Sequence, residues 1–369
     1  MSNICIIGAG QTGRGFINRY VASAGERVAF IDCDRSLVDE LGQSSSYRIT
    51  FSDPARKPVE LSNYLAFHTD DDRAHDALEV ADLVFISVGR GNLPAVNAYL
   101  NGIWSHAVSR KRVVITAENG VKVSAALESL RAIDGVQLTE AIVFCTTLGN
   151  RQTLDILSES LDYFPYGASS VDCAIPLKGM TADPDLDVLM QRKIYTYNCL
   201  SACYAYLGAY KRFEVYADAA NDGEISVIVD DIAVVINKCV SQCYGVPLHE
   251  QEQFAAMAIS KFKNRMIVDT VARNVRDPSG KLAENERLIG PLSLMASMNL
   301  DCPALLLVVA AALNYGLHSH ELANSPESYL AALPERWVSR TLTMRAELAE
   351  GRTLSDILGD VNGGNGREQ

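Results

Sequence analysis

The sequence predicts an α/β protein in which a doubly wound parallel sheet is followed by an all-helical domain. Short apolar strands alternate with helical patterns up to about residue 150, which is typical of a doubly wound sheet. From Asp185 onward the pattern changes to long helices. A glycine-rich turn at the start of the chain is the third observation, because such a turn joins the first strand and helix of these sheets.

The first residues have the pattern of a dinucleotide-binding strand–turn–helix unit. Ile4–Ile7 is a short apolar run, and Gly8, Gly10 and Gly13 follow it at the spacing G-x-G-x-x-G. In this Rossmann-type turn the three glycines make the tight turn, admit a pyrophosphate and let the helix pack close to the strand. The free N–H groups at the helix start attract the phosphates. The alternative is a glycine turn in an α/β protein that binds no dinucleotide.

An acidic residue at the end of the second strand favours NAD over NADP. Val28–Ile31 is the second apolar run, and Asp32 follows it directly. A carboxylate at this place accepts hydrogen bonds from the hydroxyls of the adenine ribose and repels a 2′-phosphate. Cys33 and Asp34 add no cation that would bind such a phosphate. We therefore expect NAD as the cofactor, with NADP disfavoured.

Two later strands end in residues that we also expect at the cofactor. One buried run ends at Val88 and Gly89, and another is followed directly by Glu118 and Asn119. The carboxyl ends of parallel strands line the crevice in which ligands bind. The predicted cofactor-binding residues are therefore Gly8, Gly10, Gln11, Thr12, Gly13, Asp32, Val88, Gly89, Glu118 and Asn119.

Further apolar runs complete the first half of the chain. Tyr47–Phe51 and Tyr64–Phe67 are predicted strands, and the runs 141–145 and 154–157 should extend the same sheet. In the second half, long helices are predicted at 187–210, 222–244, 250–273, 303–316 and 335–350.

The change in pattern predicts the domain organisation. We expect a dinucleotide-binding domain over residues 1–185, a helical substrate and catalytic domain over 186–360, and a flexible tail over 361–369.

The composition indicates a globular protein of the cytoplasm. The formal net charge of −12 argues against broad binding to nucleic acid or to an anionic membrane surface. The apolar run Ala304–Leu313 is too short to span a bilayer. The glycine turn lies where a signal peptide would have its apolar segment. We therefore expect no nucleic acid and no membrane among the partners.

The cysteines form neither a disulfide framework nor a complete metal site. Nine are present, scattered and odd in number, which indicates a reducing compartment. Cys199/Cys203 and Cys239/Cys243 are i, i+4 pairs on predicted helices, but no histidine cluster completes a four-ligand set. We therefore expect no metal, and a zinc site at one of these pairs is the alternative.

Several motifs resemble those of the polyol-specific long-chain dehydrogenases. The glycine turn continues as Arg14-Gly15-Phe16, and Glu118-Asn119 follows a sheet strand, as in that family. Arg192–Asn198 looks like the family's catalytic helix, and Arg287–Leu292 matches a late segment. The motifs keep their order and spacing over most of the chain. The resemblance is strongest to the members that act on a hexitol phosphate.

The resemblance implies a metal-independent hydride transfer with Lys193 as the general base. Such a lysine takes the proton of the substrate hydroxyl while hydride leaves the carbon for the nicotinamide. Burial and the cationic ring would lower its pKa from about 10.4. Asn198 would donate a hydrogen bond to the developing oxyanion. Five residues along an α-helix is a rotation of about 140°, so the two side chains could flank one cleft. The alternative is a surface lysine and a helix-interior asparagine.

The chain departs from the family pattern at two places. The family pattern is Lys, four residues, Asn, two residues, His, and Ser201 stands at the last position. Family members carry Asn or Asp where Thr146 stands, and Asp where Asn150 stands. We therefore expect either a substrate other than the usual hexitol phosphate, or an activity that is reduced or lost. The predicted catalytic residues are Lys193, Asn198 and Ser201. The predicted substrate-binding residues are Thr146, Arg151, Lys263, Asn264, Lys281 and Arg287. Lys263, Lys281 and Arg287 come from a basic run of the helical half that begins at Lys261.

Three hypotheses of function follow. The first is an NAD-dependent oxidoreductase that interconverts a secondary alcohol and a ketone on a polyol or polyol phosphate. The second is a dehydrogenase of the same family that acts on a non-sugar hydroxy or oxo compound of specialised metabolism, because of Ser201 and Thr146. The third is a nucleotide-binding protein without catalysis. The resemblance implies a small-molecule substrate and a monomer or small homo-oligomer.

Overall fold

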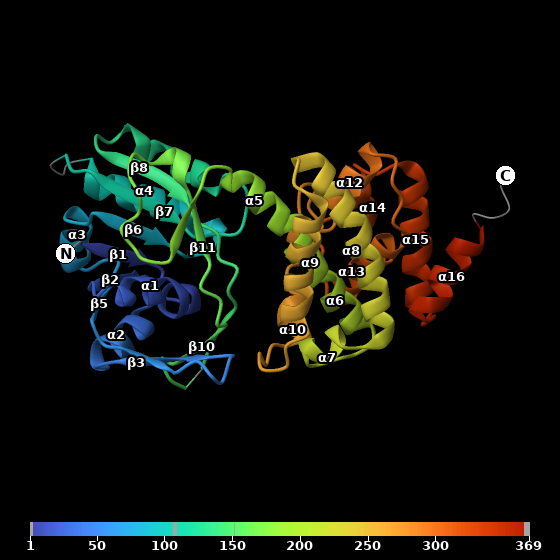
Figure 1. Ribbon diagram of the computed structural model, residues 1–369, viewed down its shortest axis with the longest axis horizontal. Coiled ribbons are helices and arrows are strands. Elements are labelled where there is room, and N and C mark those ends of the chain that lie inside the picture. Colours follow the sequence, from blue (N-terminus) through green and yellow to red (C-terminus); the bar gives the residue numbers. More distant parts are fainter. Residues whose placement is uncertain (1–2, 106–108, 151, 365–369) are drawn as a thin grey trace. The chain divides into compact units, whose positions relative to one another are not determined.

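The computed structural model, which describes residues 3–105, 109–150 and 152–364, has a six-stranded parallel sheet in the first half of the chain (Figure 1). The strand order is β5-β2-β1-β6-β7-β8, so the order reverses at β1. This is the predicted doubly wound sheet, and its carboxyl edge beside β1 is the place where ligands bind in such folds. The strands are β1 (Ile4–Ile7), β2 (Val28–Asp32), β5 (Tyr64–His68), β6 (Leu83–Ile86), β7 (Arg112–Thr116) and β8 (Val136–Glu140).

Each face of this sheet buries its own apolar core. On one face, Phe16, Ile17 and Tyr20 of the first helical segment pack against β1 and β6. On the other, Trp104 and its neighbours from the helices α3, α4 and η3 pack against the same strands. The helical segments of this half are η1 (Gly13–Ile17), α1 (Asn18–Ser23), α2 (Arg35–Gln43), α3 (Asp72–Glu79), η2 (Arg90–Asn92), α4 (Leu93–Trp104), η3 (Val123–Ala132) and η4 (Ala168–Ser170).

A second, four-stranded sheet replaces the predicted extension of the first. Its order is β4-β3-β10-β9, with β3 (Tyr47–Phe51), β4 (Val59–Leu61), β9 (Thr147–Gly149) and β10 (Ile156–Ser158). The expectation that 141–145 and 154–157 continue the main sheet is therefore wrong. After β8 the chain turns away, because the Ile142 N–H donates to the carbonyl of Pro165 at 2.9 Å. The apolar residues Cys145, Leu154 and Ile156 cover the α1 face of the main sheet instead. A pair of short parallel strands, β11 (Phe164–Gly167) and β12 (Met180–Asp183), completes this half.

The second half of the chain is helical, as predicted. Its segments are α5 (Leu186–Lys193), η5 (Ile194–Asn198), α6 (Cys199–Tyr210), α7 (Tyr216–Ala220), α8 (Gly223–Tyr244), α9 (Leu248–Phe262), α10 (Val271–Asn274), α11 (Pro278–Lys281), α12 (Ile289–Ser297), α13 (Pro303–His318), α14 (Pro326–Leu330), α15 (Glu335–Ala349) and α16 (Leu354–Gly364). The helix predicted over 250–273 is wrong beyond Phe262. There the Asn264 side chain accepts a hydrogen bond from the Met266 N–H at 2.9 Å and closes a turn that competes with the helix.

The chain divides into two compact units, Met1–Met190 and Gln191–Gln369. The predicted boundary after residue 185 lies just before α5, whereas this division falls within that helix. Residues 361–364, which we expected in the flexible tail, continue α16. Residues 365–369 of the tail lie outside the described residues.

Candidate active site

The glycine turn after β1 is tightly packed at two glycines and open at the third. Gly8 has a φ of 99°, and a Cβ there would lie 2.1 Å from the carbonyl oxygen of Ser87. A Cβ at Gly13 would lie 2.1 Å from the carbonyl oxygen of Gly8. A Cβ at Gly10 would meet no described atom within 4 Å. Gly8 and Gly13 are therefore needed for the fold, and Gly10 leaves room at the start of the helix.

A pocket of about 510 Å³ lies at the carboxyl edge of the main sheet. It brings together four of the predicted cofactor residues, namely Gly8, Gly10, Asp32 and Val88. Its other lining residues are Ile7, Ile31, Cys33, Thr69, Asp70, Ser87, Asn92, Ala95, Val96 and Tyr99. Some of these residues lie in the loop after β5 and near the start of α4. Both segments follow a strand of the sheet, so the sequence could have indicated them, but we predicted no cofactor-binding residues there.

Asp32 closes the glycine turn in addition to lining this pocket. Its Oδ2 accepts a hydrogen bond from the Ala9 N–H at 2.7 Å, and its Oδ1 accepts one from the Asp34 N–H at 2.9 Å. Each carboxylate oxygen retains a second lone pair for a ligand hydroxyl. These two backbone N–H groups therefore fix the orientation of the Asp32 carboxylate in the pocket.

Glu118 holds the backbone at the end of the neighbouring strand. Its Oε1 accepts hydrogen bonds from the N–H groups of Val88 and Gly89 at 2.6 and 2.7 Å. Burial raises the pKa of Glu118, and these two hydrogen bonds oppose that rise. Asn119 follows it and is exposed. Hydrogen bonds therefore join Glu118, Val88 and Gly89 at the end of β6.

The side chains of Gln11 and Thr12, two further predicted cofactor residues, differ in their contacts. The amide of Gln11 lies against β9, where its nitrogen donates to the Thr147 carbonyl at 2.9 Å and its oxygen accepts from the Gly149 N–H at 3.2 Å. Thr12 precedes η1, and its side chain makes no capping hydrogen bond. A cofactor contact of Gln11 would therefore come from its backbone, because its side chain joins the turn to the second sheet.

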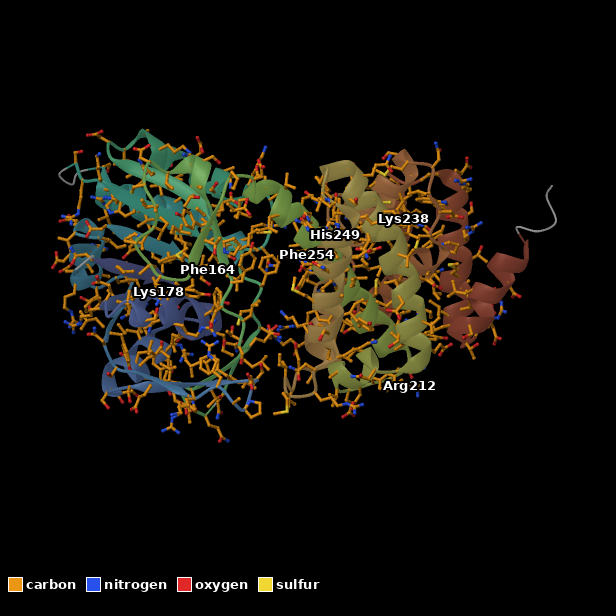
Figure 2. The ribbon with its side chains drawn as sticks, in the orientation of Figure 1. Phe164, Lys178, Arg212, Lys238, His249 and Phe254 are labelled. Carbon is orange, nitrogen blue, oxygen red and sulfur yellow. The ribbon has the colours of Figure 1, made fainter. Side chains whose placement is uncertain are left out.

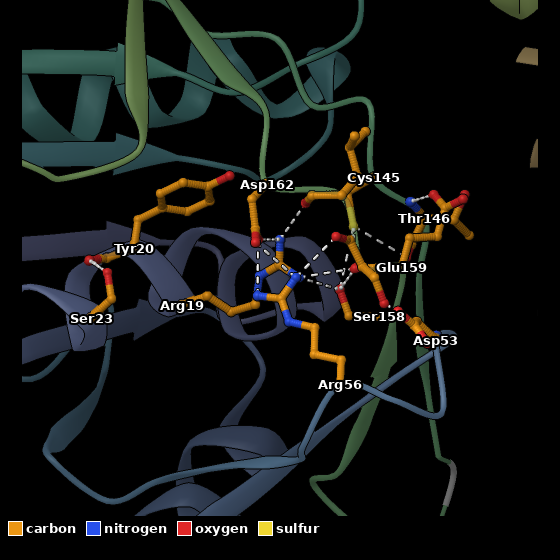
Figure 3. A network of polar contacts seen from close by, with 12 residues as sticks. Arg19, Tyr20, Ser23, Asp53, Arg56, Cys145, Thr146, Ser158, Glu159 and Asp162 are labelled. Atoms are coloured by element: carbon orange, nitrogen blue, oxygen red, sulfur yellow. Dashed lines mark hydrogen bonds and ion pairs between the residues drawn. The ribbon is translucent and has the colours of Figure 1, made fainter. Parts of the chain in front are cut away.

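Thr146 lies in a network of polar contacts between the first helix and the second sheet (Figure 3). Its N–H donates to the buried carboxylate of Glu159, and its carbonyl accepts from the Glu159 N–H at 3.0 Å. Arg19 donates to the Ser158 Oγ at 3.2 Å and to the Glu159 carbonyl at 3.0 Å. The network fixes the backbone of Thr146. Arg151, the other predicted substrate residue of this segment, lies outside the described residues.

Lys193 is the most strongly perturbed cation of the helical unit. It ends α5, and only 5% of its surface is exposed. Burial, and after it the charges of Lys261 and Arg287, lower the pKa of Lys193 to about 7. A lysine that is half neutral near physiological pH is able to take a proton. Such shifted groups concentrate at functional sites.

Asn198 is aligned with Lys193 by a π-turn. The Cys199 N–H donates to the carbonyl of Ile194, five residues earlier, so Ile194–Asn198 is wound more widely than an α-helix. Because hydrogen bonds of a π-helix join residues i and i+5, a side chain five positions on stands nearly above its partner. The rotation of about 140° that we expected for an α-helix is therefore wrong here. The two side chains share one face of the helix.

Ser201, one turn beyond Asn198, is joined to Tyr216 of α7. The Tyr216 hydroxyl lies 3.0 Å from the Ser201 Oγ and 3.1 Å from the Ser201 carbonyl, and it donates to them. Burial raises the pKa of Tyr216 far above its usual value, so this hydroxyl stays protonated. The sequence did not indicate Tyr216 as a partner of Ser201, because the two residues lie on different helices.

The cations predicted to bind substrate differ in their surroundings. Burial and the charge of Arg287 lower the pKa of Lys281 to about 8, and its Nζ donates to the Arg276 carbonyl. Arg287 pairs with Glu286 at 3.4 Å, and its buried Nε has no hydrogen-bond partner among the described residues. Lys281, Arg287 and Lys193 are therefore three basic side chains of the helical unit, and the charge of Arg287 lowers the pKa of both lysines.

Lys263 and Asn264 lie in the turn that follows α9. Asn264 uses its side-chain oxygen for the turn after α9, and the Lys263 carbonyl accepts from the Asn221 amide at 3.0 Å. The lysine of this segment whose charge acts on Lys193 is Lys261. Lys261 belongs to the same basic run as Lys263, and we predicted no role for it.

Among the described residues, no group of three or more His, Cys, Asp or Glu side chains could hold a metal ion. The same residues contain no helix that is long and apolar enough to cross a membrane.

The fold and the site define the class of the protein, which is a Rossmann-type oxidoreductase. Residues 185–350 match the family model "Mannitol dehydrogenase C-terminal domain". The chain is 26% identical over 330 residues to the mannitol-1-phosphate 5-dehydrogenase of Caldanaerobacter subterraneus, covering 83% of this chain and 84% of that protein. It is 28% identical to the enzyme of the same name from Emericella nidulans, with 84% of each chain covered. The chain is thus related to the mannitol dehydrogenases, which confirms the predicted resemblance.

A solved structure supports the fold over nearly the whole chain. The mannitol 2-dehydrogenase of Pseudomonas fluorescens, in a ternary complex with NAD and D-mannitol, superposes with a TM-score of 0.80 at 13% sequence identity. The likeness covers 97% of this chain and 94% of that chain. An α/β sheet domain followed by helices is therefore the architecture that this chain shares with it.

Proposed function

We propose that the protein is an NAD-dependent dehydrogenase that interconverts a secondary alcohol and a ketone on a polyol or polyol phosphate. The observation that carries this proposal is Lys193, a buried lysine whose pKa is lowered to about 7 and which shares a helix face with Asn198. A lysine in that state is suited to accept the proton of an alcohol.

The first unit has the features that NAD requires. Gly10 leaves space at a helix start where a pyrophosphate would sit, and Asp32 lies in the adjoining pocket with lone pairs for ribose hydroxyls. The carboxylate of Asp32 in that pocket disfavours a 2′-phosphate. When bound, the nicotinamide accepts hydride from the carbon that carries the reacting hydroxyl.

Lys193 and Asn198 have different roles at the reacting oxygen. Neutral Lys193 accepts the hydroxyl proton at Nζ as the C–H bond breaks, and it returns the proton when a ketone is reduced. The Asn198 amide donates a hydrogen bond to the same oxygen, whose negative charge grows during proton transfer. The π-turn supports this assignment, since it directs both side chains to one face.

A phosphate or another anionic group on the substrate suits the cations of the helical unit. Arg287 has a buried Nε without a partner among the described residues, and burial, with the charge of Arg287 after it, lowers the pKa of Lys281 to about 8. An anion near them would satisfy the arginine and restore the charge of the lysine. Both residues are proposed ligands of that group.

The test is formation of NADH over a panel of polyols and polyol phosphates, with Lys193→Met beside the wild type. Lys238→Met is the matched control, because Lys238 is an exposed lysine of α8 (Figure 2). We expect turnover of at least one panel member, its loss in Lys193→Met and its retention in Lys238→Met. An unchanged rate in Lys193→Met would remove Lys193 from the mechanism.

The contact between Ser201 and Tyr216 favours a second candidate function. A hydroxyl pair occupies the position where the resemblance leads one to expect an imidazole. The substrate would then be a non-sugar hydroxy or oxo compound of specialised metabolism. Turnover of such a carbonyl compound, with no turnover on the polyol panel, would favour this candidate.

A further inference from the structure

One buried glutamine contacts the helix on both sides of Lys193. Gln251 lies on α9 and is 0% exposed. Its Oε1 accepts a hydrogen bond from the Arg192 Nε at 3.1 Å. Its Nε2 donates to the Thr196 Oγ1 at 2.8 Å and to the Asn237 Oδ1 at 3.3 Å. The whole amide is therefore engaged in holding neighbouring elements, in a place where water does not reach.

The two contacts on the Lys193 helix lie on either side of the lysine. Arg192 precedes it directly, and Thr196 is the middle residue of the π-turn that follows it. A helical threonine ordinarily bonds its hydroxyl to a backbone carbonyl one turn back. Here the Thr196 Oγ1 accepts the proton of Gln251, and the side chain is 0% exposed. Gln251 thus fixes the direction of the helix before and within the π-turn.

Aromatic contacts add to this attachment. The Arg192 guanidinium lies over the ring of Phe254 at 4.8 Å, and the Tyr197 ring lies 4.9 Å from that of Phe254. Downstream, α6 is held separately, because nearly all of its side chains are buried. The π-turn is the place where these two rigidly held parts of the helix meet. Loss of Gln251 removes the hydrogen bonds that hold the upstream part, and rewinding of that part as an α-helix would change the direction of Lys193 by about 100° per residue of slip.

We propose that Gln251 is a positioning residue for Lys193. By holding Arg192 and Thr196 it maintains the π-turn, and the π-turn keeps Lys193 and Asn198 on one face. This inference rests on the proposed function, in which Lys193 acts as the base. Gln251 itself does not touch the reacting atoms.

Two variants remove the contact from opposite sides. Gln251→Leu removes the amide, and Thr196→Val removes only the acceptor with little change of volume. Thr341→Val is the matched control, because Thr341 is a 0% exposed threonine of α15 that donates to the Trp337 carbonyl at 2.7 Å, away from the π-turn. We expect all three to lower the melting temperature to a similar degree.

The decisive readout needs no substrate. The rate at which an amine-reactive reagent modifies Lys193 is measured against pH by peptide mass spectrometry, and the midpoint gives the pKa of the lysine. We expect a midpoint near 7 in the wild type and in Thr341→Val. In Gln251→Leu and Thr196→Val we expect it to rise by at least about one unit, as the lysine reaches water.

Turnover supplies a second readout on the substrate that the panel identifies. We expect kcat to fall about 100-fold in Gln251→Leu, the cost of misplacing a catalytic group. The double variant Gln251→Leu/Thr196→Val should lose no more turnover than Gln251→Leu alone, because the contact that Thr196→Val removes is already absent from Gln251→Leu.

A midpoint that stays near 7 in Gln251→Leu would overturn the proposal, whatever happens to the melting temperature. If the wild type turns over no panel member, the proposed function fails on that ground, and the labelling still decides the role of Gln251.

Discussion

The carboxylate of Asp32 and the N–H of Ala9 are joined by a hydrogen bond of 2.7 Å, so the residue that would hold the ribose also holds the glycine turn. Asp32→Ala should therefore weaken NAD binding in two ways, by removing a ligand and by loosening the turn. Hydrogen bonds to charged groups contribute about 1.5–3 kcal/mol, which predicts a rise of roughly 10- to 100-fold in the Kd for NAD. Titration calorimetry measures it.

Asp39→Ala is the control for this experiment, because Asp39 is an exposed carboxylate of α2 that does not line the pocket. It should leave the Kd unchanged. An unchanged Kd in Asp32→Ala would show that NAD does not bind at this carboxylate.

Two glycines of the same segment should respond differently to alanine. A Cβ at Gly15 would lie 2.4 Å from the Ile156 Cγ2, so Gly15→Ala must push β10 away and should destabilise the fold by about 1–3 kcal/mol. A Cβ at Gly10 meets no described atom within 4 Å, so Gly10→Ala should fold normally. It should nevertheless abolish NAD binding, because its methyl group occupies the space of the pyrophosphate. Thermal melting and calorimetry on both variants test the pair, and the reverse pattern would contradict it.

The sequence predicted those parts of the fold that depend on local pattern. The main sheet, its glycine turn and most long helices follow from apolar periodicity and glycine spacing, which act over a few residues. The second sheet could not be predicted in the same way. β3 and β10 pair as parallel strands although they are far apart in the chain, and Arg14 and Arg19, both of them buried, hold this region by donating to backbone carbonyls such as those of Leu154 and Glu159.

The candidate site divides along the same line. Spacing and resemblance predicted Lys193 and Asn198 as catalytic residues. Their alignment depends on a π-turn, which no residue pattern in the sequence indicates. Gln251, Tyr216 and Lys261 act on that helix from other helices, so only the folded chain brings them to it.

The lowered pKa of Lys193 predicts the pH dependence of the reaction. Oxidation of the alcohol needs the neutral lysine, so its rate should rise with pH through about 7 and then level off. Reduction of the ketone needs the protonated lysine and should fall over the same range. Initial rates in both directions between pH 5 and 9 measure this. If the rates of oxidation and reduction both rose, or both fell, with pH over this range, the assignment of Lys193 as the base would be contradicted.

The same residue predicts how stability depends on pH. The pKa of Lys193 is lowered by folding, so between about 7 and the ordinary lysine value near 10.5 the unfolded chain binds a proton that the folded chain does not. The contribution of Lys193 to the free energy of unfolding therefore rises with pH across this window. Below about pH 7 the buried lysine is protonated in both states, and it then destabilises the folded chain by its full amount. Lys193→Met should remove this slope and raise the melting temperature more at pH 7 than at pH 10. Calorimetric melts at several pH values measure it, and a melting temperature of Lys193→Met that is lower at pH 7 would contradict it.

Lys261 should set part of the pKa of Lys193. Its charge disfavours the protonated lysine, so Lys261→Met should raise the labelling midpoint of Lys193 by roughly half a unit or more. Lys263→Met is the matched control two residues further on, and it should leave the midpoint unchanged. If Lys263→Met moved the midpoint and Lys261→Met did not, Lys261 would not be the lysine whose charge acts on Lys193.

The hydroxyl contact between Tyr216 and Ser201 predicts the effect of placing a histidine at position 201. The Tyr216 Oη lies 3.0 Å from the Ser201 Oγ, so an imidazole there would have to displace the buried tyrosine. Ser201→His should therefore lower both the melting temperature and the turnover of the best polyol substrate. Tyr216→Phe removes the contact to the Ser201 Oγ that Ser201→Ala also removes, so the double variant should lose no more turnover than Tyr216→Phe alone. A rise in polyol turnover in Ser201→His would contradict this, because it would mean that the histidine fits and that a single residue separates this pocket from one built for a polyol.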